Sequence, residues 1–268
     1  MAIETPWSLR DEGTGARAAT PPAIRRIGPA DIGAALRAGI DDFLAIPTQL
    51  VFLGLIYPLV GLVAARAALG GDMLALLWPM VAGLSLLGPV AALGLTNLSR
   101  RRERGESVRW TKAFALSRAA SPGAILGMTL VLAAIFLLWL AAAQAIHAAT
   151  LGPQQPPSLG ALVDEVFGTR EGWRLLLIGN LVGFGFALLV LAISVVSLPL
   201  LLDRKATLAT AIGTSLRACR TNPGPMALWG LVVAAGLALG CIPLFVGLAV
   251  VMPVLGHASW HLYRRVVV

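Results

Sequence analysis

The stretch from 124 to 149 reads AILGMTLVLAAIFLLWLAAAQAIHAA and decides the fold class. It holds no Asp, Glu, Lys or Arg, and it exceeds the roughly 20 apolar residues that a helix needs to cross a bilayer. The rest of the chain is similar, with 57% of its 268 residues hydrophobic and 13% charged. Soluble domains are about 45–50% apolar and about 25% charged. The composition therefore excludes an ordinary soluble enzyme and a disordered protein, and it predicts a membrane protein.

Five further apolar stretches are long enough to be spans, at 47–65, 73–98, 175–202, 226–241 and 244–262. As one straight helix, 226–262 would be about 55 Å long, against a hydrocarbon core of about 30 Å. We therefore expect a break near Gly240 and Pro243, where a helix continues least easily. The sequence predicts an all-α polytopic membrane domain over 25–265, with six transmembrane helices between a disordered cytoplasmic tail (1–24) and a short C-terminal end (266–268).

The basic residues predict the orientation of these spans. With the N-terminus in the cytoplasm, the outer segments keep only three of the 21 Lys and Arg residues, namely Arg66, Arg170 and Arg174. Cytoplasmic loops of membrane proteins are enriched in Lys and Arg, so we expect both chain ends inside (N-in/C-in). Five spans would place Arg264 and Arg265 outside. The net charge of +8 is then a consequence of threading, and no nucleic-acid partner is expected.

An amphipathic helix is predicted before each odd-numbered span. In the first, one apolar face carries Ile32, Leu36, Ile40 and Leu44, with Ala35, Gly39 and Phe43 beside them and Arg37 and Asp41 facing away. The second covers 107–120, and the third covers 207–221 with Leu208, Ile212, Leu216 and Cys219 aligned. Such helices lie flat in the membrane interface, where they brace the bundle or contact lipid or a partner. The candidate contacts are Arg37, Trp110, Lys112 and Arg217.

Two of these units resemble a known group of proteins. The segments ALRAGIDDF (35–43) up to Pro47, and SLRA (215–218) up to NPG (222–224), are similar to a widespread bacterial family known only as a domain of unknown function in predicted integral membrane proteins. The chain is also distantly similar, over about 25–265, to the membrane domain of some bacterial glycerophosphodiester phosphodiesterases, but it lacks their soluble catalytic domain. The resemblance implies a multi-pass protein of the bacterial inner membrane and no enzymatic activity.

A further amphipathic helix is predicted in the outer loop between the third and fourth spans. Ser158 is a suitable helix N-cap, and an apolar stripe follows over 158–168 at Leu159, Leu162, Val163, Val166 and Phe167. We expect a short helix on the outer surface. A lid over an opening is the alternative, because a plain connector needs neither this length nor the stripe.

The sequence offers few groups for chemistry. His257 and His261 share a helix face, which allows a metal or haem ligand, but the Glu of a zinc-protease motif is missing. Beside Trp260 and Tyr263, anchoring in the membrane interface is the preferred interpretation. The polar residues inside the spans are almost all neutral and are expected to bond between helices; they are Asn97, Gln144, Asn180, Ser194 and Ser197. We expect no enzyme, cofactor or metal.

Three glycine pairs with GxxxG spacing allow helices to approach closely. They are Gly123 and Gly127, Gly179 and Gly183, and Gly236 and Gly240. Packing within the chain is the simpler explanation, and a partner membrane protein or a second copy is left open. The sequence thus predicts a non-catalytic membrane protein that organises or assembles a membrane complex or binds lipid. The alternative is a small transporter or channel for an uncharged or lipid-like substrate.

Overall fold

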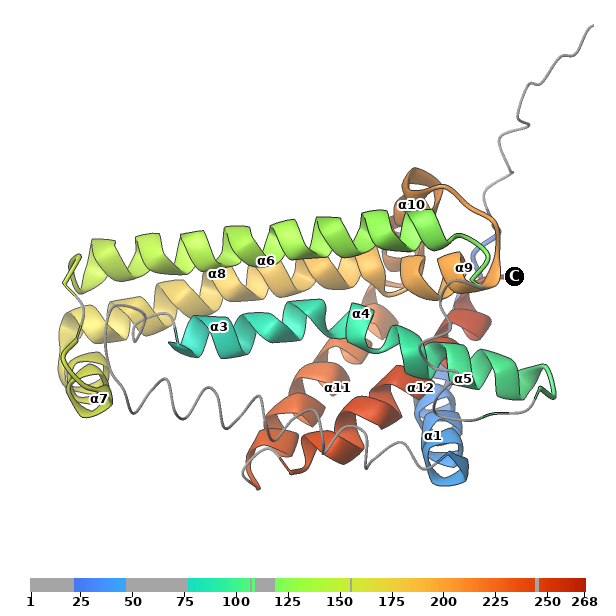
Figure 1. The fold of residues 1–268 in the computed structure, drawn as a ribbon, viewed down its shortest axis with the longest axis horizontal. Coiled ribbons are helices and arrows are strands. Elements are labelled where there is room, and N and C mark those ends of the chain that lie inside the picture. The colour runs from blue at the N-terminus through green and yellow to red at the C-terminus, as the bar shows by residue number, and fades with distance from the viewer. Residues whose placement is uncertain (1–21, 47–76, 107, 109–118, 155, 244–245) are drawn as a thin grey trace, which may run out of the picture.

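The computed structural model describes residues 22–46, 77–106, 108, 119–154, 156–243 and 246–268 (Figure 1). Over these residues the regular structure is helical, and the one β feature is an isolated antiparallel bridge between Ile24 and Val267. The predicted all-α class is confirmed for this part of the chain.

The longest helices form a hairpin along the long axis of the molecule (Figure 1). Helix α6 (Pro122–Thr150) begins with a proline in its first turn, where the missing N–H costs nothing, and ends before Gly152, which has a positive φ of 93°. Helix α8 (Arg170–Ser194) returns beside it and leads into α9 (Ser197–Asp203). The connecting α7 (Leu159–Gly168) closes the far end, and Ser158 caps it by accepting from the Ala161 N–H at 3.1 Å, as predicted.

Within the described residues, three helical stretches are long and apolar enough to cross a membrane: Pro122–Thr150, Arg170–Asp203 and Pro223–Cys241. They coincide with the predicted spans 124–149, 175–202 and 226–241. The break predicted near Gly240 and Pro243 is present, because α11 (Pro223–Cys241) ends there and α12 begins at Leu248 (Leu248–Val266). Helix α12 lies where the sixth span is predicted but is not one of the three. The predicted span 47–65 lies outside the described residues.

The predicted span 73–98 is not one continuous helix. Residues 73–76 lie outside the described part, and the remainder divides into α3 (Leu77–Leu84), a 3-10 turn η2 (Ser85–Leu87), α4 (Gly88–Ala91) and α5 (Leu93–Glu103). Pro89 explains the interruption, because a proline has no N–H to donate and its ring clashes with the preceding turn of a helix. Helix α5 then continues past 98 into the basic residues.

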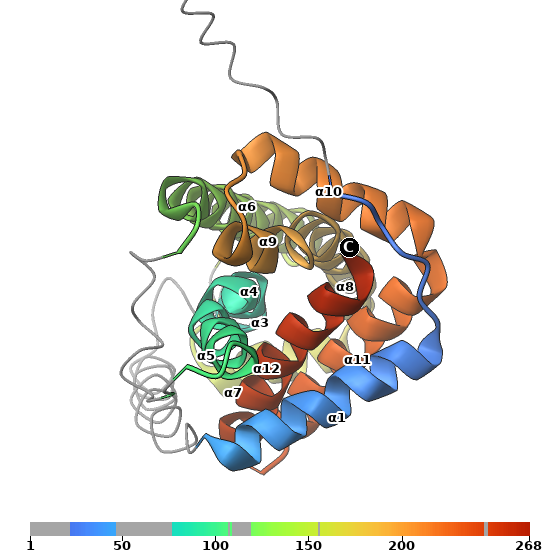
Figure 2. The same ribbon diagram turned by 90° about the vertical axis from the view of Figure 1, so that its right-hand side faces the viewer.

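Two amphipathic helices cross the end of the molecule that carries the C-terminus. Figure 2 shows α1 (Pro29–Ala45) and α10 (Leu208–Thr221) along their length, whereas α6 and α8 are seen nearly end-on. In α10 the predicted apolar face is confirmed, since Leu208, Ile212 and Leu216 pack against the core. The predicted helix over 107–120 lies largely outside the described residues.

The predicted apolar face of α1 is confirmed at Ile32, Ala35, Leu36 and Gly39 and is wrong at Ile40 and Leu44. Its buried residues are Ile32, Ala35, Gly39 and Asp42, whereas Ile40 is 43% and Leu44 is 74% exposed. The reason is the close approach of α12: a Cβ built on Gly39 would lie 2.7 Å from both the Cβ and the backbone N of Ala258. At this contact, small residues and not Ile40 or Leu44 therefore face α12.

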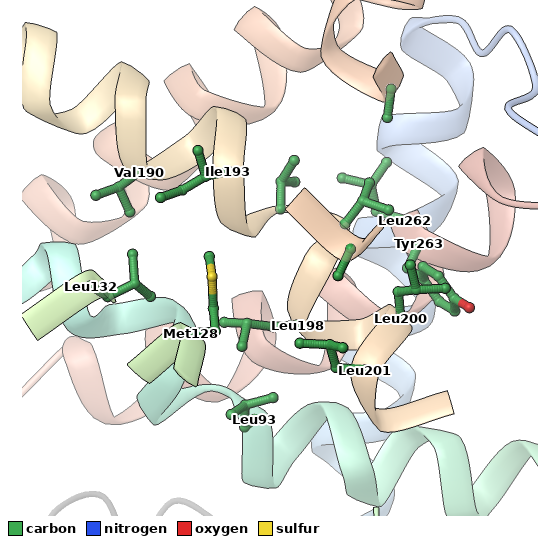
Figure 3. Packing of buried hydrophobic residues seen from close by; sticks show 14 of the residues in the cluster. Leu93, Met128, Leu132, Val190, Ile193, Leu198, Leu200, Leu201, Leu262 and Tyr263 are labelled. Carbon is green, nitrogen blue, oxygen red and sulfur yellow. The ribbon is translucent and has the colours of Figure 1, made fainter. Parts of the chain in front are cut away.

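The apolar core lies where α5, α6, α8, α9 and α12 meet (Figure 3). Its labelled members come from these five helices and are Leu93, Met128, Leu132, Val190, Ile193, Leu198, Leu200, Leu201, Leu262 and Tyr263. Away from this core, both long helices expose leucines, at Leu126, Leu130, Leu137 and Leu138 on α6 and at Leu177, Leu181, Leu188 and Leu189 on α8. An apolar outer surface of this kind is what a lipid environment requires.

The predicted glycine pairs contribute unequally to packing. One pair is close-packed at both members: a Cβ on Gly236 would lie 3.2 Å from Val251, and one on Gly240 would lie 2.7 Å from Leu248. In the other two pairs only Gly127 and Gly183 face a neighbour within 4 Å, and Gly123 and Gly179 face none. Close approaches outside these pairs include Gly39, Gly256, where Leu95 lies 2.6 Å from a built Cβ, and Gly83, where Trp139 lies 2.5 Å from one.

We expect Gly39→Ala to lower the free energy of unfolding by about 1–3 kcal/mol, because overpacking forces α1 away from α12. Thermal unfolding of the purified protein in mild detergent, followed by circular dichroism, measures the change. The matched control is Gly33→Ala on the same helix, where a Cβ has no neighbour within 4 Å. That control should be neutral or stabilising by up to about 1 kcal/mol. Equal midpoints for the two variants would contradict the close contact.

Candidate functional site

The strongest concentration of polar contacts between helices surrounds the Asp42 carboxylate, which α1 holds against α5 and α12. The His261 Nε2 atom lies 2.8 Å from Asp42 Oδ2, and Arg102 donates from Nη1 to Asp42 Oδ1 at 2.5 Å. The Asp42 side chain is 6% exposed. One buried carboxylate therefore joins three helices that are far apart in the sequence.

A second contact lies one helical turn along α12. His257 is fully buried, and its Nδ1 lies 2.8 Å from the Ser99 hydroxyl of α5, while its Nε2 has no hydrogen-bond partner within the described structure. Beside it, the Thr96 hydroxyl donates to the Gly256 carbonyl at 3.1 Å. The two predicted histidines thus do share a face, but that face is turned into the protein.

The electrostatics of the site favour an ionised Asp42. Burial raises the pKa of this carboxyl group, but hydrogen bonds from His261, Ser99 and Arg102 outweigh it and lower the pKa to about 2. The carboxylate is therefore charged at neutral pH and is stabilised by its partners.

Three further acidic residues of this end also bridge helices. Glu103 accepts from the Trp260 indole N–H at 2.6 Å and from Arg264 at 3.0 Å. Asp203 accepts from the Tyr263 hydroxyl at 3.0 Å and pairs with Arg104 at 2.8 Å, and Asp31 pairs with Arg265 at 3.0 Å. The interpretation of Trp260, Tyr263 and the histidines as interfacial anchors is therefore wrong for the aromatic pair and for His257, because all three are buried against neighbouring helices.

The predicted contact residues are not brought together. Arg37 is exposed on α1 and Arg217 is exposed on α10, and these helices lie on opposite sides of the end view (Figure 2). Arg217 donates to the Thr214 hydroxyl at 3.2 Å. Trp110 and Lys112 lie outside the described residues.

The neutral polar residues of the spans mostly bond within their own helix and not between helices. Ser194 donates to the Val190 carbonyl, Ser197 to Ile193 and Asn180 to Leu176. Asn97 is buried and accepts from Arg100, three residues further along α5. For Ser194, Ser197 and Asn180, the described structure shows bonds within the helix and no bond between helices.

The chemistry of the cluster suits helix attachment. Within the described residues, no group of three or more His, Cys, Asp or Glu side chains is arranged to hold a metal ion. Asp42, Ser99 and Arg102 were not predicted as members of the cluster. The available signal was that Asp42 follows Gly39 by three residues, which places a carboxylate on the face of small residues.

Comparison with known families now adds one finding. Residues 77–203 match the family model of a predicted integral membrane protein, DUF2189. The match runs from α3 through α9 and includes Ser99 and Arg102, but it excludes α1 and α12. No curated protein and no solved structure matches the chain. The resemblance to a domain of unknown function in membrane proteins is thereby supported over this segment, and no finding supports the similarity to glycerophosphodiester phosphodiesterases.

We expect Asp42→Asn to lower the free energy of unfolding by about 2 kcal/mol at pH 7. The reason is that the pKa of this carboxyl group falls from about 4 in the unfolded chain to about 2 in the fold, which stabilises the folded state by about this amount. This contribution is complete above the unfolded-state pKa of about 4 and is lost as the pH falls toward 2. Unfolding midpoints of wild type and variant, measured in detergent between pH 7 and pH 2, should converge at the acidic end.

The control for this prediction is Asp41→Asn, the neighbouring exposed carboxylate. It should leave the free energy of unfolding within about 0.5 kcal/mol of wild type at every pH. A gap between wild type and Asp42→Asn that does not narrow below pH 4 would show that the carboxylate is not the stabilising group.

Proposed function

We propose that this chain is a non-catalytic integral protein of a bacterial inner membrane that organises or assembles a membrane complex or binds lipid. The observation that carries the proposal is the position of Asn180. This amide is exposed on α8, on the same outer face as Leu177 and Leu181, which are 73% and 69% exposed. An amide that faces hydrocarbon is costly unless another polar group bonds to it.

One polar atom of the Asn180 side chain is available to a partner. Its Nδ2 donates to the Leu176 carbonyl at 2.7 Å, and no hydrogen bond of the described residues uses its side-chain oxygen. Asn180 lies about 15 Å along α8 from Arg170, well inside the predicted span. Asparagine in a spanning helix hydrogen-bonds across to a neighbouring helix. Within the described residues no other helix bonds to Asn180, and the proposal assigns this role to a partner protein.

The six-span, N-in/C-in topology is part of this proposal. The bridge between Ile24 and Val267, together with the bond from the Val268 N–H to the Ala23 carbonyl at 3.1 Å, holds the two ends of the described chain side by side. Adjacent ends on one side of a bilayer require an even number of crossings. The basic residues of α5 and α10 gather at this same end, which supports a cytoplasmic location.

Helix α7 fits the opposite membrane surface. Its exposed stripe of Leu159, Val163 and Phe167 continues into Trp173, whose ring packs edge-on against Phe167 with centroids 6.2 Å apart. Tryptophan and amphipathic helices are typical of the interface between lipid and water. An interfacial helix accounts for this stripe without a lid.

One observation favours the alternative of a transporter. The Gln144 side-chain oxygen and both ring nitrogens of His147 are buried near the α7 end without a hydrogen-bond partner in the described structure. Buried polar groups of this kind are typical of a polar path. Asn97, another buried polar residue of the predicted spans, lies at the opposite end of the bundle. Gln144, His147 and Asn97 therefore do not line one continuous route.

The topology predicts which introduced thiols are accessible from outside. With the native Cys219 and Cys241 replaced by alanine, Gln154→Cys should react with a membrane-impermeant maleimide in intact cells. Lys205→Cys and Val268→Cys should react only after permeabilisation. All three positions are exposed, so accessibility reports the side of the membrane. Labelling of Val268→Cys from outside would overturn the cytoplasmic location of this end of the chain.

The partner proposal predicts what co-purifies from native membranes in mild detergent. Wild type should retain a defined protein or lipid, identified by mass spectrometry, and Asn180→Leu should lose most of it without a loss of thermal stability. Leu188→Ile, an apolar exchange on the same helix, is the matched control and should retain it. A wild-type protein that repeatedly purifies alone, free of protein and lipid, would refute the proposal.

A further inference from the structure

An open cavity of about 480 Å³ lies at the end of the molecule where the basic residues of α5 and α10 gather. It lies between the segment entering α1 and the last two turns of α10, and its lining residues are Pro22, Ile24, Arg217, Arg220 and Thr221. Two arginines and a threonine of α10 line it together with two apolar residues of the entering segment. The cavity therefore combines anion-binding and apolar surface.

The two arginines are available for a ligand. They stand three residues apart on α10 and so share a face, and both are exposed. Arg217 has a weak contact with the Thr214 hydroxyl, and neither arginine pairs with a carboxylate in the described residues. At the same end, Arg102, Arg104, Arg264 and Arg265 all form ion pairs. The positive charge of Arg217 and Arg220 is thus not neutralised within the described protein.

The walls of the cavity are held in place by Asn222, which is buried at the end of α10. Its Oδ1 accepts from the Ile27 N–H at 2.8 Å, and its Nδ2 donates to the Arg25 carbonyl at 3.1 Å. These bonds attach the entering segment to the junction of α10 and α11. A cavity with tethered walls requires little ordering when a ligand binds.

We propose that this cavity binds the phosphate group of an anionic phospholipid, with Arg217 and Arg220 on the phosphate and with Pro22 and Ile24 against the adjoining apolar part. Guanidinium groups bind phosphate oxygens through charge-assisted, often paired hydrogen bonds. The inference rests on the proposed membrane location, because α10 crosses the axis of the spans (Figure 2) and so lies parallel to the bilayer surface. The apolar wall favours a lipid over free phosphate.

The test uses full-length protein in mild detergent, with native mass spectrometry counting bound phosphatidylglycerol or phosphatidylcholine. Wild type should bind phosphatidylglycerol preferentially, and Arg217→Gln/Arg220→Gln should weaken that binding by about tenfold or more. The matched control, Arg174→Gln/Lys205→Gln, removes the same charge from exposed residues outside the cavity and should keep wild-type binding. Unfolding midpoints establish that all variants are folded.

Two results would overturn the assignment. Equal losses in the cavity variant and the control would show a general effect of charge. Displacement of phosphatidylglycerol by millimolar inorganic phosphate would assign the site to free phosphate. The count of bound phosphatidylglycerol is measured separately from the Asn180→Leu and thiol-labelling experiments. If the cavity variant binds lipid like wild type, the partner and topology proposals still stand. If those two proposals fail, the count of bound lipid is unchanged.

Discussion

The arrangement depends on the contact between α1 and α12, in which the absence of a side chain at Gly39 lets two helices approach to backbone distance. This closeness brings the Asp42 carboxylate within reach of His261 and of Arg102 from α5. The buried charge is tolerable only with those partners, because an unpaired carboxylate in such a place carries a desolvation cost of several kcal/mol. Steric fit and charge pairing therefore require each other at this junction.

The molecule separates its chemistry by position. Ion pairs and hydrogen bonds between helices gather at the end where residues 22–24 meet the C-terminus, whereas α6 and α8 extend away from it with leucines outward. A bilayer supplies no hydrophobic force between helices, since lipid chains are as apolar as leucine. Attachment by polar groups at one end, combined with close packing of Gly236 and Gly240 against α12, supplies cohesion that apolar burial alone does not give there.

The sequence was a good guide wherever the physics is local. Length and apolarity predicted α6, α8 and α11, Ser158 predicted the start of α7, and Gly240 with Pro243 predicted the break before α12. It was a poor guide to which face points inward. In water an apolar stripe marks the protein side, but beside lipid both sides are apolar, so Ile40 and Leu44 did not identify the buried face of α1. The polar cluster was also out of reach, because Asp42 and His261 are 219 residues apart.

That separation has a consequence for biogenesis. Helix α1 emerges from the ribosome early. Its buried face packs against α12, which emerges near the end of the described chain. Until then Asp42 has neither His261 nor the close surface around Ala258, so α1 remains an unburied amphipathic helix while the intervening spans are inserted. The fold is therefore completed late, when α12 packs against α1. A nascent chain stalled before Leu248 exposes the Asp42 carboxylate and the small-residue face of α1, which distinguishes it from the completed protein.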